Sequence, residues 1–468
     1  MLLLKKTYQA FFILGVFLIP FNSDIPKWMG FLGEYSSDSS PLFFIISFIF
    51  LLVYQLKSGK IYIPYRTIEY QLLMLFIAVL FFVTLLNIHH IIDYYFKQTS
   101  GIMRFVRQMI ALLISAGAFL YTFLNVGKDF GALPFFFLLR KLFLISFVLV
   151  FCCGFVEFLI VTFNLTQLRP IFDLFDMFPF VNTRLDFKLT RVSSLTYEPP
   201  ALGTYLITAA GFLFSYILTG KKIIRFLPFV LLVFLAIVSK SRTAFVVILL
   251  QAFVGVILTY IYYKDFRKYF NIALLFTVIG VASVSFVYRA AVTEAIQERI
   301  SSFDFTDTKF SQTNNSVSNK SRLGIQTAMI QTIKEYPIFG TGWGQQAFIS
   351  RYHYPNWALK NNYEFTARYR NQFDKSFPPG FNLYLRIAAE AGMVGLISFL
   401  LFLFVIVNNT TFWFKKDTQT KFIPIVLLIS FVGYIFNWLQ IDSFKLYGFW
   451  LCLALFILYK NRKLDTTH

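Results

Sequence analysis

Apolar segments long enough to cross a membrane recur along the whole chain, and they restrict its fold more than any other feature. The first follows Lys5 and Lys6 and ends near Pro20 with no small-residue cleavage site after it, so we expect an uncleaved helix. Eleven more follow, at residues 41–56, 69–87, 106–124, 142–163, 200–219, 224–239, 243–262, 271–288, 387–408, 422–439 and 444–459. Because a helix crosses the hydrocarbon core with about 20 apolar residues, the sequence predicts an all-α, polytopic integral membrane bundle of about 12 transmembrane helices.

The charge of the chain fits a membrane protein better than a nucleic-acid-binding protein. Only 14% of the residues are charged, although the formal net charge is +20, and soluble domains have about 25% charged residues. Most of the basic residues stand in short clusters beside the apolar segments, at 5–6, 57–66, 128–141, 221–225, 264–268, 415–421 and 460–463. Such clusters mark the cytoplasmic side of a membrane. They predict that both chain ends are cytoplasmic and that two long polar segments, 164–199 and 289–384, lie on the opposite face.

The longer of these polar segments divides the chain. We expect an N-terminal membrane bundle of nine spans at 1–288 that includes the loop 164–199, a large loop subdomain at 289–384, and a C-terminal bundle of three spans at 385–468. Within the large loop, residue spacing predicts helices at 290–302 and 321–336 and a mobile tip at 308–320. Glycines at 340, 342 and 344 predict a tight turn whose backbone approaches another surface closely.

Four groups of polar residues are expected at or beyond the outer face. They are Arg191 to Glu198 before a span, Lys240 to Thr243 between two spans, Arg322 with the glycine turn, and Asn382 to Gly395 at the start of a span. In the last group, Gly392 and Gly395 are best explained as close-packing positions between helices. Cys152, Cys153 and Cys452 fall inside apolar segments and the histidines form no metal motif, so we expect neither a disulfide nor a zinc site.

The charged residues of these groups have structural and functional explanations. Arg191 would be a solvated loop charge, and Glu198 would cap the helix that follows it. Lys240 and Arg242 would reach into lipid headgroups. However, the orientation rule places basic residues on the inner side, so cations in a short outer turn call for an anionic partner. Guanidinium groups contact phosphate oxygens at two points, and Arg191, Arg242 and Arg322 on one face would hold a lipid-linked diphosphate.

Taken in order, these groups resemble the O-antigen polymerase and ligase superfamily, which contains the Wzy-type polysaccharide polymerases and the WaaL-type O-antigen ligases. The blocks that carry the resemblance are Glu198-Pro199, Ser241-Arg242-Thr243-Ala244, Arg322 with Pro337-Ile338-x-Gly340-x-Gly342, and Asn382-x-x-Leu385-x-x-x-x-Glu390-x-Gly392-x-x-Gly395. They cover about residues 190–400. Phe381 departs from the family pattern, in which a His precedes the Asn. That His is regarded as important in the ligases, so its absence counts against a ligase.

The resemblance implies glycosyl transfer at the periplasmic face of a bacterial inner membrane, in the synthesis of lipopolysaccharide O-antigen or a related surface polysaccharide. The implied donor and acceptor are undecaprenyl-diphosphate-linked oligosaccharides, and the implied chemistry uses no metal or other cofactor. The lipid bilayer, a chain-length regulator and a flippase of the same pathway are the implied partners, and nucleic acid is not among them.

In such a reaction Arg242 and Arg322 would stabilise the departing diphosphate, and Glu198 would be the general base. The identity of the base stays open, because Glu390 or His353 could take that role instead. The other substrate-binding candidates are Arg191, Lys240, Tyr197, His353, Asn382, Arg386 and Glu390, with the exposed Arg351, Arg368 and Arg370 as glycan contacts.

Two alternatives to a polymerase remain. An O-antigen ligase would transfer finished glycan to lipid A core. A transporter or flippase for lipid-linked sugars would need charges or broken helices in the middle of its spans, and Glu157 is the main charge of that kind.

Overall fold

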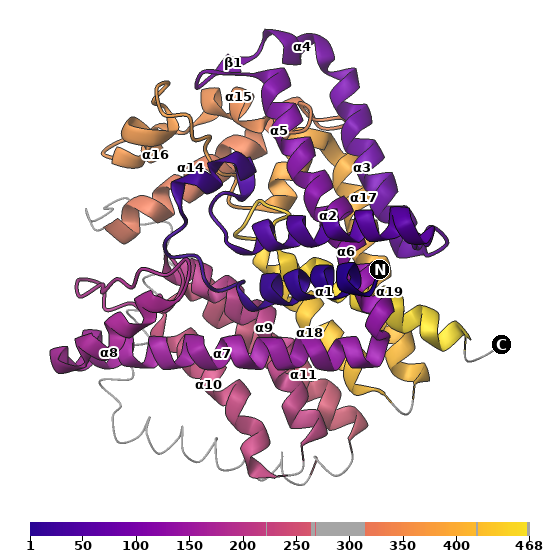
Figure 1. Ribbon diagram of the computed structural model, residues 1–468. Helices are drawn as coiled ribbons and strands as arrows, with labels where there is room; N and C mark the ends of the chain where they lie inside the picture. The colour runs from indigo at the N-terminus through magenta and orange to yellow at the C-terminus, as the bar shows by residue number, and fades with distance from the viewer. Residues whose placement is uncertain (221, 264–266, 268–313, 418–419, 466–468) are drawn as a thin grey trace.

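The computed structural model describes residues 1–220, 222–263, 267, 314–417 and 420–465 (Figure 1). The span expected at 271–288 and the helix expected at 290–302 lie outside these residues. The long helices are α1 (Leu2–Phe17), α2 (Ser40–Ser58), α3 (Ile68–Leu86), α5 (Gly101–Leu113), α6 (Leu120–Phe130), α7 (Ala132–Phe163), α9 (Pro199–Thr219), α10 (Leu227–Val238), α11 (Arg242–Tyr262), α14 (Asn314–Glu335), α17 (Leu383–Lys416), α18 (Phe422–Asn437) and α19 (Tyr447–Asp465).

Short elements connect them. The short α-helices are α4 (Ile88–Asp93), α8 (Arg169–Asp173), α15 (Gln346–Ser350) and α16 (Asn356–Leu359). The 3-10 helices are η1 (Lys27–Tyr35), η3 (Thr166–Leu168), η4 (Leu174–Met177), η5 (Ile223–Phe226) and η6 (Arg351–His353), and the π-helical segments are η2 (Ile114–Phe119) and η7 (Phe365–Tyr369). The only strands among the described residues are β1 (Tyr95–Phe96) and β2 (Thr99–Ser100), which form an antiparallel hairpin.

The predicted fold class is confirmed. Seven of the described helices are long and apolar enough to cross a membrane, and η5 with α10, and α18, are shorter apolar helices. Every span predicted within the described residues coincides with a helix. Three of these helices are longer than the predicted spans. The predicted spans 106–124, 142–163 and 387–408 lie within the observed helices 101–130, 132–163 and 383–416. Hydropathy marks only the part of a helix that suits lipid, so polar turns at its ends escape detection.

Helix α9 lies at the centre of one half of the bundle. It is buried along most of its length and packs against α7, α10, α11 and α18. Small residues permit the close approach: a Cβ added to Gly203 would lie 2.6 Å from Ala244 Cβ of α11, and one added to Gly211 would lie 2.2 Å from Ser430 Oγ of α18. Helix α1 packs against α2 and α7, and these three run across the view in Figure 1. Helix α17 packs against α3 and α18.

Polar contacts join several helices at the end of the bundle that carries both chain ends. Lys460 of α19 pairs with the fully buried Glu69 of α3 at 3.0 Å, and Lys5 of α1 pairs with Asp129 of α6 at 3.1 Å. Next to them, Gln55 Nε2 of α2 donates to Asn125 Oδ1 of α6 at 2.9 Å. The side of the membrane on which the two chain ends lie stays a prediction from the basic clusters.

The described part of the large loop folds onto α14 at the other end of the bundle. Its small apolar core contains Ile325, Ala328, Met329, Tyr354, Ala358, Phe365 and Ala389. The predicted helix 321–336 is present, but α14 already begins at Asn314. The prediction of a mobile tip is therefore wrong for 314–320, where polar composition concealed a helical turn that is anchored at Lys320 by a hydrogen bond to the Lys360 carbonyl. The rest of that tip lies outside the described residues.

The glycine turn and α17 form one structural unit. At Gly392, φ is +63° and ψ is −165°, so the helical hydrogen bonding of α17 is interrupted. The backbone groups released there pair with the segment 337–342: Thr341 N donates to Ala389 O at 3.0 Å, and Met393 N donates to Pro337 O at 2.8 Å. A Cβ on Gly392 would lie 2.1 Å from Ile338 O. The close backbone approach predicted for the glycine turn is present.

The two glycines of α17 do not have the role predicted for them. The neighbour of Gly392 is the backbone of the loop at Ile338, and a Cβ on Gly395 would meet Ala391 and Ile387 of its own helix. Neither glycine therefore marks close packing between two helices. Their spacing resembles a helix-packing motif, whereas here it marks a break in one helix.

Candidate functional site

A cavity lined by cations lies where the loop before α9, the α10–α11 turn, α14 and the start of α17 meet. It has a volume of about 390 Å³. Arg191, Lys240, Arg242 and Arg322 line it, and none of its described lining residues is a carboxylate. We call it the cation cavity. The structure thus brings the three predicted arginines together from segments that are far apart in the sequence. Four cations at one cavity create a field that favours an anion with several charges.

Lys240 holds the loop that carries Arg191. Its Nζ donates to the carbonyl of Leu189 at 3.2 Å and to the hydroxyl of Thr190. Lys240 and Thr190 both have positive φ, of 53° and 46°. Such backbone conformations are unfavourable for side-chain-bearing residues and gather at functional sites, so both residues are consistent with a functional site here. Lys240 therefore positions the cavity wall as well as charging it.

Glu157 holds the same loop from the other side. Its carboxylate, near the C-terminal end of α7, accepts hydrogen bonds from Ser193 N at 3.0 Å and Ser194 N at 2.6 Å. The side chain of Glu157 is buried, and Ser194 has a φ of 54°. The charge noted within an apolar segment therefore serves as an anchor for the loop. It does not lie free in the middle of a span, as a transport pathway would require.

Arg322 and Phe381 form the wall between the cation cavity and a neighbouring cavity. The guanidinium carbon of Arg322 lies 5.0 Å from the ring centroid of Phe381, and its Nε has no hydrogen-bond acceptor among the described residues. Phe381 has a φ of 54°, a strained value for a bulky residue. The aromatic face fixes the Arg322 side chain, and the Nε–H group of Arg322 is available to a ligand.

The neighbouring cavity contains the candidate base. It has a volume of about 420 Å³, and its lining includes Asp38, Tyr197, Glu198, Arg322 and Lys445. We call it the carboxylate cavity. Glu198 is accessible from it and precedes α9, but its side chain makes no capping hydrogen bond. Glu198 nevertheless occupies the N-cap position of α9, where a carboxylate charge is favourable.

The carboxyl group of Glu198 has a pKa above its ordinary value. Surrounding protein atoms desolvate the charged form and raise the pKa, whereas the positive charge of Arg322 and a hydrogen bond from the Tyr197 hydroxyl lower it. Desolvation is the largest of these effects. A carboxylate with a raised pKa is a better proton acceptor. Tyr197, expected to bind substrate, lies beside Glu198 as its hydrogen-bond donor.

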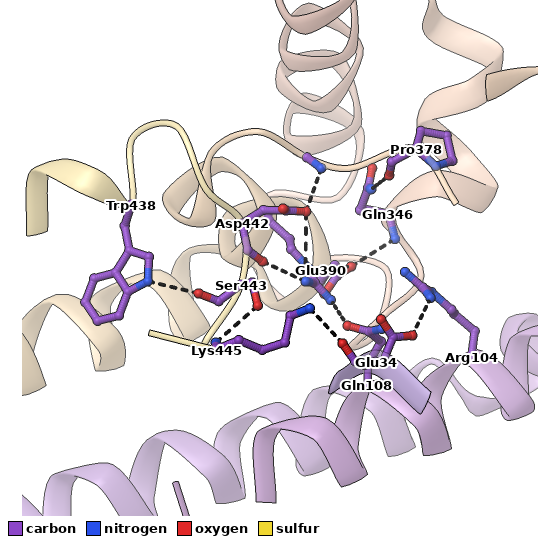
Figure 2. A network of polar contacts seen from close by, with 12 residues as sticks. Glu34, Arg104, Gln108, Gln346, Pro378, Glu390, Trp438, Asp442, Ser443 and Lys445 are labelled. Carbon is purple, nitrogen blue, oxygen red and sulfur yellow. Dashed lines mark hydrogen bonds and ion pairs between the residues drawn. The ribbon is translucent and has the colours of Figure 1, made fainter. Parts of the chain in front are cut away.

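A third cavity, of about 190 Å³, adjoins the carboxylate cavity through Pro379, Asp442, Ser443 and Lys445, which line both. We call it the balanced cavity, and Figure 2 shows the polar network around it. Arg386 Nε lies 3.3 Å from Glu390, and Arg386 donates to Gln108 Oε1 at 2.6 Å and to Asp442 O at 2.8 Å. Arg386 and Glu390 thus pair with each other here, away from the cation cavity.

The other predicted candidates lie elsewhere. Asn382 caps α17, because its Oδ1 accepts a hydrogen bond from Leu385 N at 3.0 Å. His353 lies 3.0 Å from Glu335 at the end of α14 and lines none of the three cavities. Arg351, Arg368 and Arg370 also line none of them. The geometry therefore offers no support for His353 as a replacement base.

Sequence reasoning missed most of the balanced cavity. Its unpredicted charged residues are Glu34, Arg104, Asp442 and Lys445, and its further unpredicted polar residues include Gln108, Gln346 and Ser443. Lys240 and Arg242 were identified because cations are unusual on the expected outer side of the membrane. The same argument applies to Arg104 and Lys445, which also stand at expected outer ends of spans. Glu34 and Asp442 stand in short connections without a motif, so only their tertiary contacts single them out.

Comparison with known families fits this arrangement. Residues 227–400 match the family model described as O-antigen ligase. This match supports the resemblance of the chain to the O-antigen polymerase and ligase superfamily. The matched residues include Arg242, Arg322, the glycine turn and the break in α17, whereas Arg191 and Glu198 lie before them. Among curated proteins no match to the chain is found. The match supports a role of the O-antigen polymerase or ligase type, and the apolar helices indicate a membrane protein.

Proposed function

We propose that this protein polymerises undecaprenyl-diphosphate-linked oligosaccharide repeat units at the periplasmic face of the inner membrane. The observation that carries the proposal is the joining of two cavities at Arg322. On one side lie four cations with no carboxylate, and on the other lies Glu198 with a raised pKa. A diphosphate leaving group and an acceptor hydroxyl need these two environments next to each other.

In the proposed reaction, a hydroxyl oxygen of the acceptor sugar attacks the anomeric carbon of the donor. The bond between that carbon and the phosphate oxygen breaks, and its electron pair leaves with the lipid diphosphate. The hydroxyl proton passes to Glu198. No metal or other cofactor takes part. Because negative charge develops on the departing oxygen, Arg242 and Arg322 stabilise the transition state more than the ground state.

The decisive test replaces the arginines one at a time. We expect Arg242→Ala and Arg322→Ala each to lower polymer formation about 100-fold or more, since one preorganised donor contributes about this much in comparable sites. Arg242→Lys should also be costly, because an ammonium group cannot make the two-point contact. The measurement is the polysaccharide ladder formed by purified protein from lipid-linked repeat units. A normal ladder from Arg242→Ala at wild-type protein level would refute the assignment.

A ligase that transfers glycan to lipid A core is the second candidate, supported by the description of the matching family model. Phe381 at the junction of the cavities disfavours it, because the ligase pattern has His there. Gene deletion separates the two. Loss of a polymerase leaves surface lipopolysaccharide with a single repeat unit, whereas loss of a ligase leaves none attached.

A flippase for lipid-linked sugars has less support. The charge that suggested it, Glu157, is engaged by the backbone of the loop at 193–194. In the proposed pathway a separate flippase delivers the lipid-linked units and a chain-length regulator acts on the polymer. Purified protein that moved lipid-linked sugar across vesicles without lengthening it would overturn the enzymatic proposal.

A further inference from the structure

The balanced cavity differs chemically from the cation cavity. Its lining contains the cations Arg104, Arg386 and Lys445 and the carboxylates Glu34, Glu390 and Asp442, so the formal charges cancel. Arg104 pairs with Glu34 at 3.2 Å, and Lys445 Nζ donates to the Glu34 carbonyl at 2.7 Å (Figure 2). A second diphosphate would meet as many carboxylates as cations here. The field of this cavity therefore suits an uncharged polar ligand.

Two hydrogen-bond donors at this cavity have no acceptor among the described residues. Trp343 is 1% exposed, and its indole Nε1 is unpartnered. The Nε of Arg104 is also buried and unpartnered. Buried donors are normally satisfied, and those that are not call for an explanation. A ligand with hydroxyl groups would explain these two donors, because a hydroxyl accepts from N–H groups and donates to carboxylates such as Glu34.

Aromatic rings complete the lining. The guanidinium of Arg104 lies 4.3 Å from the ring centroid of Phe377, and that of Arg386 lies 4.7 Å from the ring centroid of Trp343. The two rings therefore hold the guanidinium groups of Arg104 and Arg386 in place at the cavity. The volume of about 190 Å³ is smaller than the roughly 300–1,000 Å³ of most small-molecule sites, so it suits one sugar unit.

The three cavities follow one another in a defined order. The carboxylate cavity shares Arg322 and Phe381 with the cation cavity, and shares Pro379 and Asp442 with the balanced cavity. Direct displacement at an anomeric carbon requires the nucleophile on the face opposite the leaving group. With the diphosphate in the cation cavity, the acceptor hydroxyl must approach from the side of Glu198, and the acceptor glycan continues toward the balanced cavity.

We propose that the balanced cavity is the acceptor subsite, in which Trp343, Arg104 and Glu34 bind an uncharged sugar near the non-reducing end of the acceptor glycan. This inference rests on the proposed glycosyl transfer and adds a binding site to it. The substrate class follows from the cancelled charges, and the position follows from the order of the cavities.

The test separates glycan binding from diphosphate binding. Repeat units that accumulate on lipid in a deletion strain are released by mild acid, and the free oligosaccharide is titrated against purified full-length protein by saturation-transfer NMR. Inorganic pyrophosphate is titrated separately. We expect Trp343→Phe and Glu34→Gln each to weaken oligosaccharide binding about fivefold, the effect of one lost hydrogen bond, and to leave pyrophosphate binding unchanged. Arg242→Ala should show the reverse.

Trp357→Phe is the matched control, because Trp357 lies on α16, is 42% exposed and lines none of the three cavities. If a folded Trp343→Phe or Glu34→Gln protein binds the oligosaccharide with wild-type affinity, the acceptor subsite is wrong. The proposed function would still stand in that case if pyrophosphate binding depends on Arg242. Pyrophosphate binding that ignores Arg242 would instead contradict the proposed function. If Trp343→Phe does not fold, Glu34→Gln decides, since the Glu34 side chain is 35% exposed. A uronic acid at the non-reducing end of the repeat unit would contradict the charge argument.

Discussion

Tyr197 lowers the pKa of Glu198, the proposed base, and has no proposed contact with the diphosphate. Its hydroxyl donates a hydrogen bond that lowers the pKa of Glu198 against the larger effect of desolvation. Removing that donor in Tyr197→Phe should raise the pKa of Glu198. A base works only in its ionised form, so activity is lost as pH falls through that pKa. We expect the acid limb of the pH profile of kcat/KM to move to higher pH in Tyr197→Phe, with activity near wild type on the alkaline side.

Tyr352→Phe provides the control for that experiment, since Tyr352 is 71% exposed on the large loop and lines none of the three cavities. Its profile should match that of the wild type. An acid limb that stays in place in Tyr197→Phe would remove Glu198 from the role of base.

Glu157 is a positioning residue that acts through Arg191. Glu157→Gln removes the charge and replaces one carboxylate oxygen with an NH2 group, which cannot accept from the N–H groups at 193–194. Hydrogen bonds to a charged group contribute about 1.5–3 kcal/mol, so we expect polymer formation to fall about tenfold or more. The double variant Glu157→Gln/Arg191→Ala should be no worse than Arg191→Ala alone. Additive losses would show that Glu157 supports the fold generally and not Arg191.

At the scale of elements, the break in α17 is the part that sequence reasoning described least well. Gly392→Ala places a Cβ 2.1 Å from Ile338 O at a φ of +63°. Strain of this kind costs about 1–3 kcal/mol before the clash is counted. We expect a marked loss of thermal stability in detergent and loss of activity, because the turn at 337–342 and the cavities beside it move together.

Gly117→Ala is the comparison for that variant. Gly117 lies in the π-helical segment η2, and a Cβ added there meets no atom within 4 Å. It should melt near the wild-type temperature. Equal melting temperatures for the two variants would mean that the backbone contact at Gly392 is not required.

The hairpin β1–β2 joins the large loop to the membrane bundle. Lys97, in its turn, is buried, and its Nζ donates to the carbonyls of Arg368 at 2.6 Å, Asn371 at 3.0 Å and Asp374 at 2.9 Å. The ammonium group of Lys97 thus binds three backbone carbonyls of the segment 368–374 and holds this segment against the hairpin.

For the molecule as a whole, the proposed orientation can be tested by labelling single cysteines in intact cells. Phe373 of the large loop and Leu56 of α2 are almost equally exposed, at 84% and 85%. A membrane-impermeant maleimide should label Phe373→Cys and should not label Leu56→Cys until the cells are opened. Cys153 and Cys452 are buried, so we replace the exposed Cys152 in both proteins. Labelling of Leu56→Cys alone would reverse the orientation.

The sequence by itself determined the fold class and much of the candidate site. Partition of an apolar segment into lipid depends on that segment alone, and each span predicted from hydropathy within the described residues coincides with a helix. The orientation rule likewise made Lys240 and Arg242 conspicuous, because it acts on one loop at a time. The same local reasoning could not separate a helix-packing glycine from one at a helix break, and Gly392 was assigned wrongly.

Only the tertiary structure decided how these residues are shared among cavities. It placed Arg322 between the cation cavity and Glu198, paired Arg386 with Glu390 away from the diphosphate site, and turned Asn382 into a helix cap. It also assembled the balanced cavity from residues as distant in sequence as Glu34 and Lys445. The physical reason is that burial in lipid is a property of one segment, whereas the partner of a charge is fixed by contacts between segments that fold together.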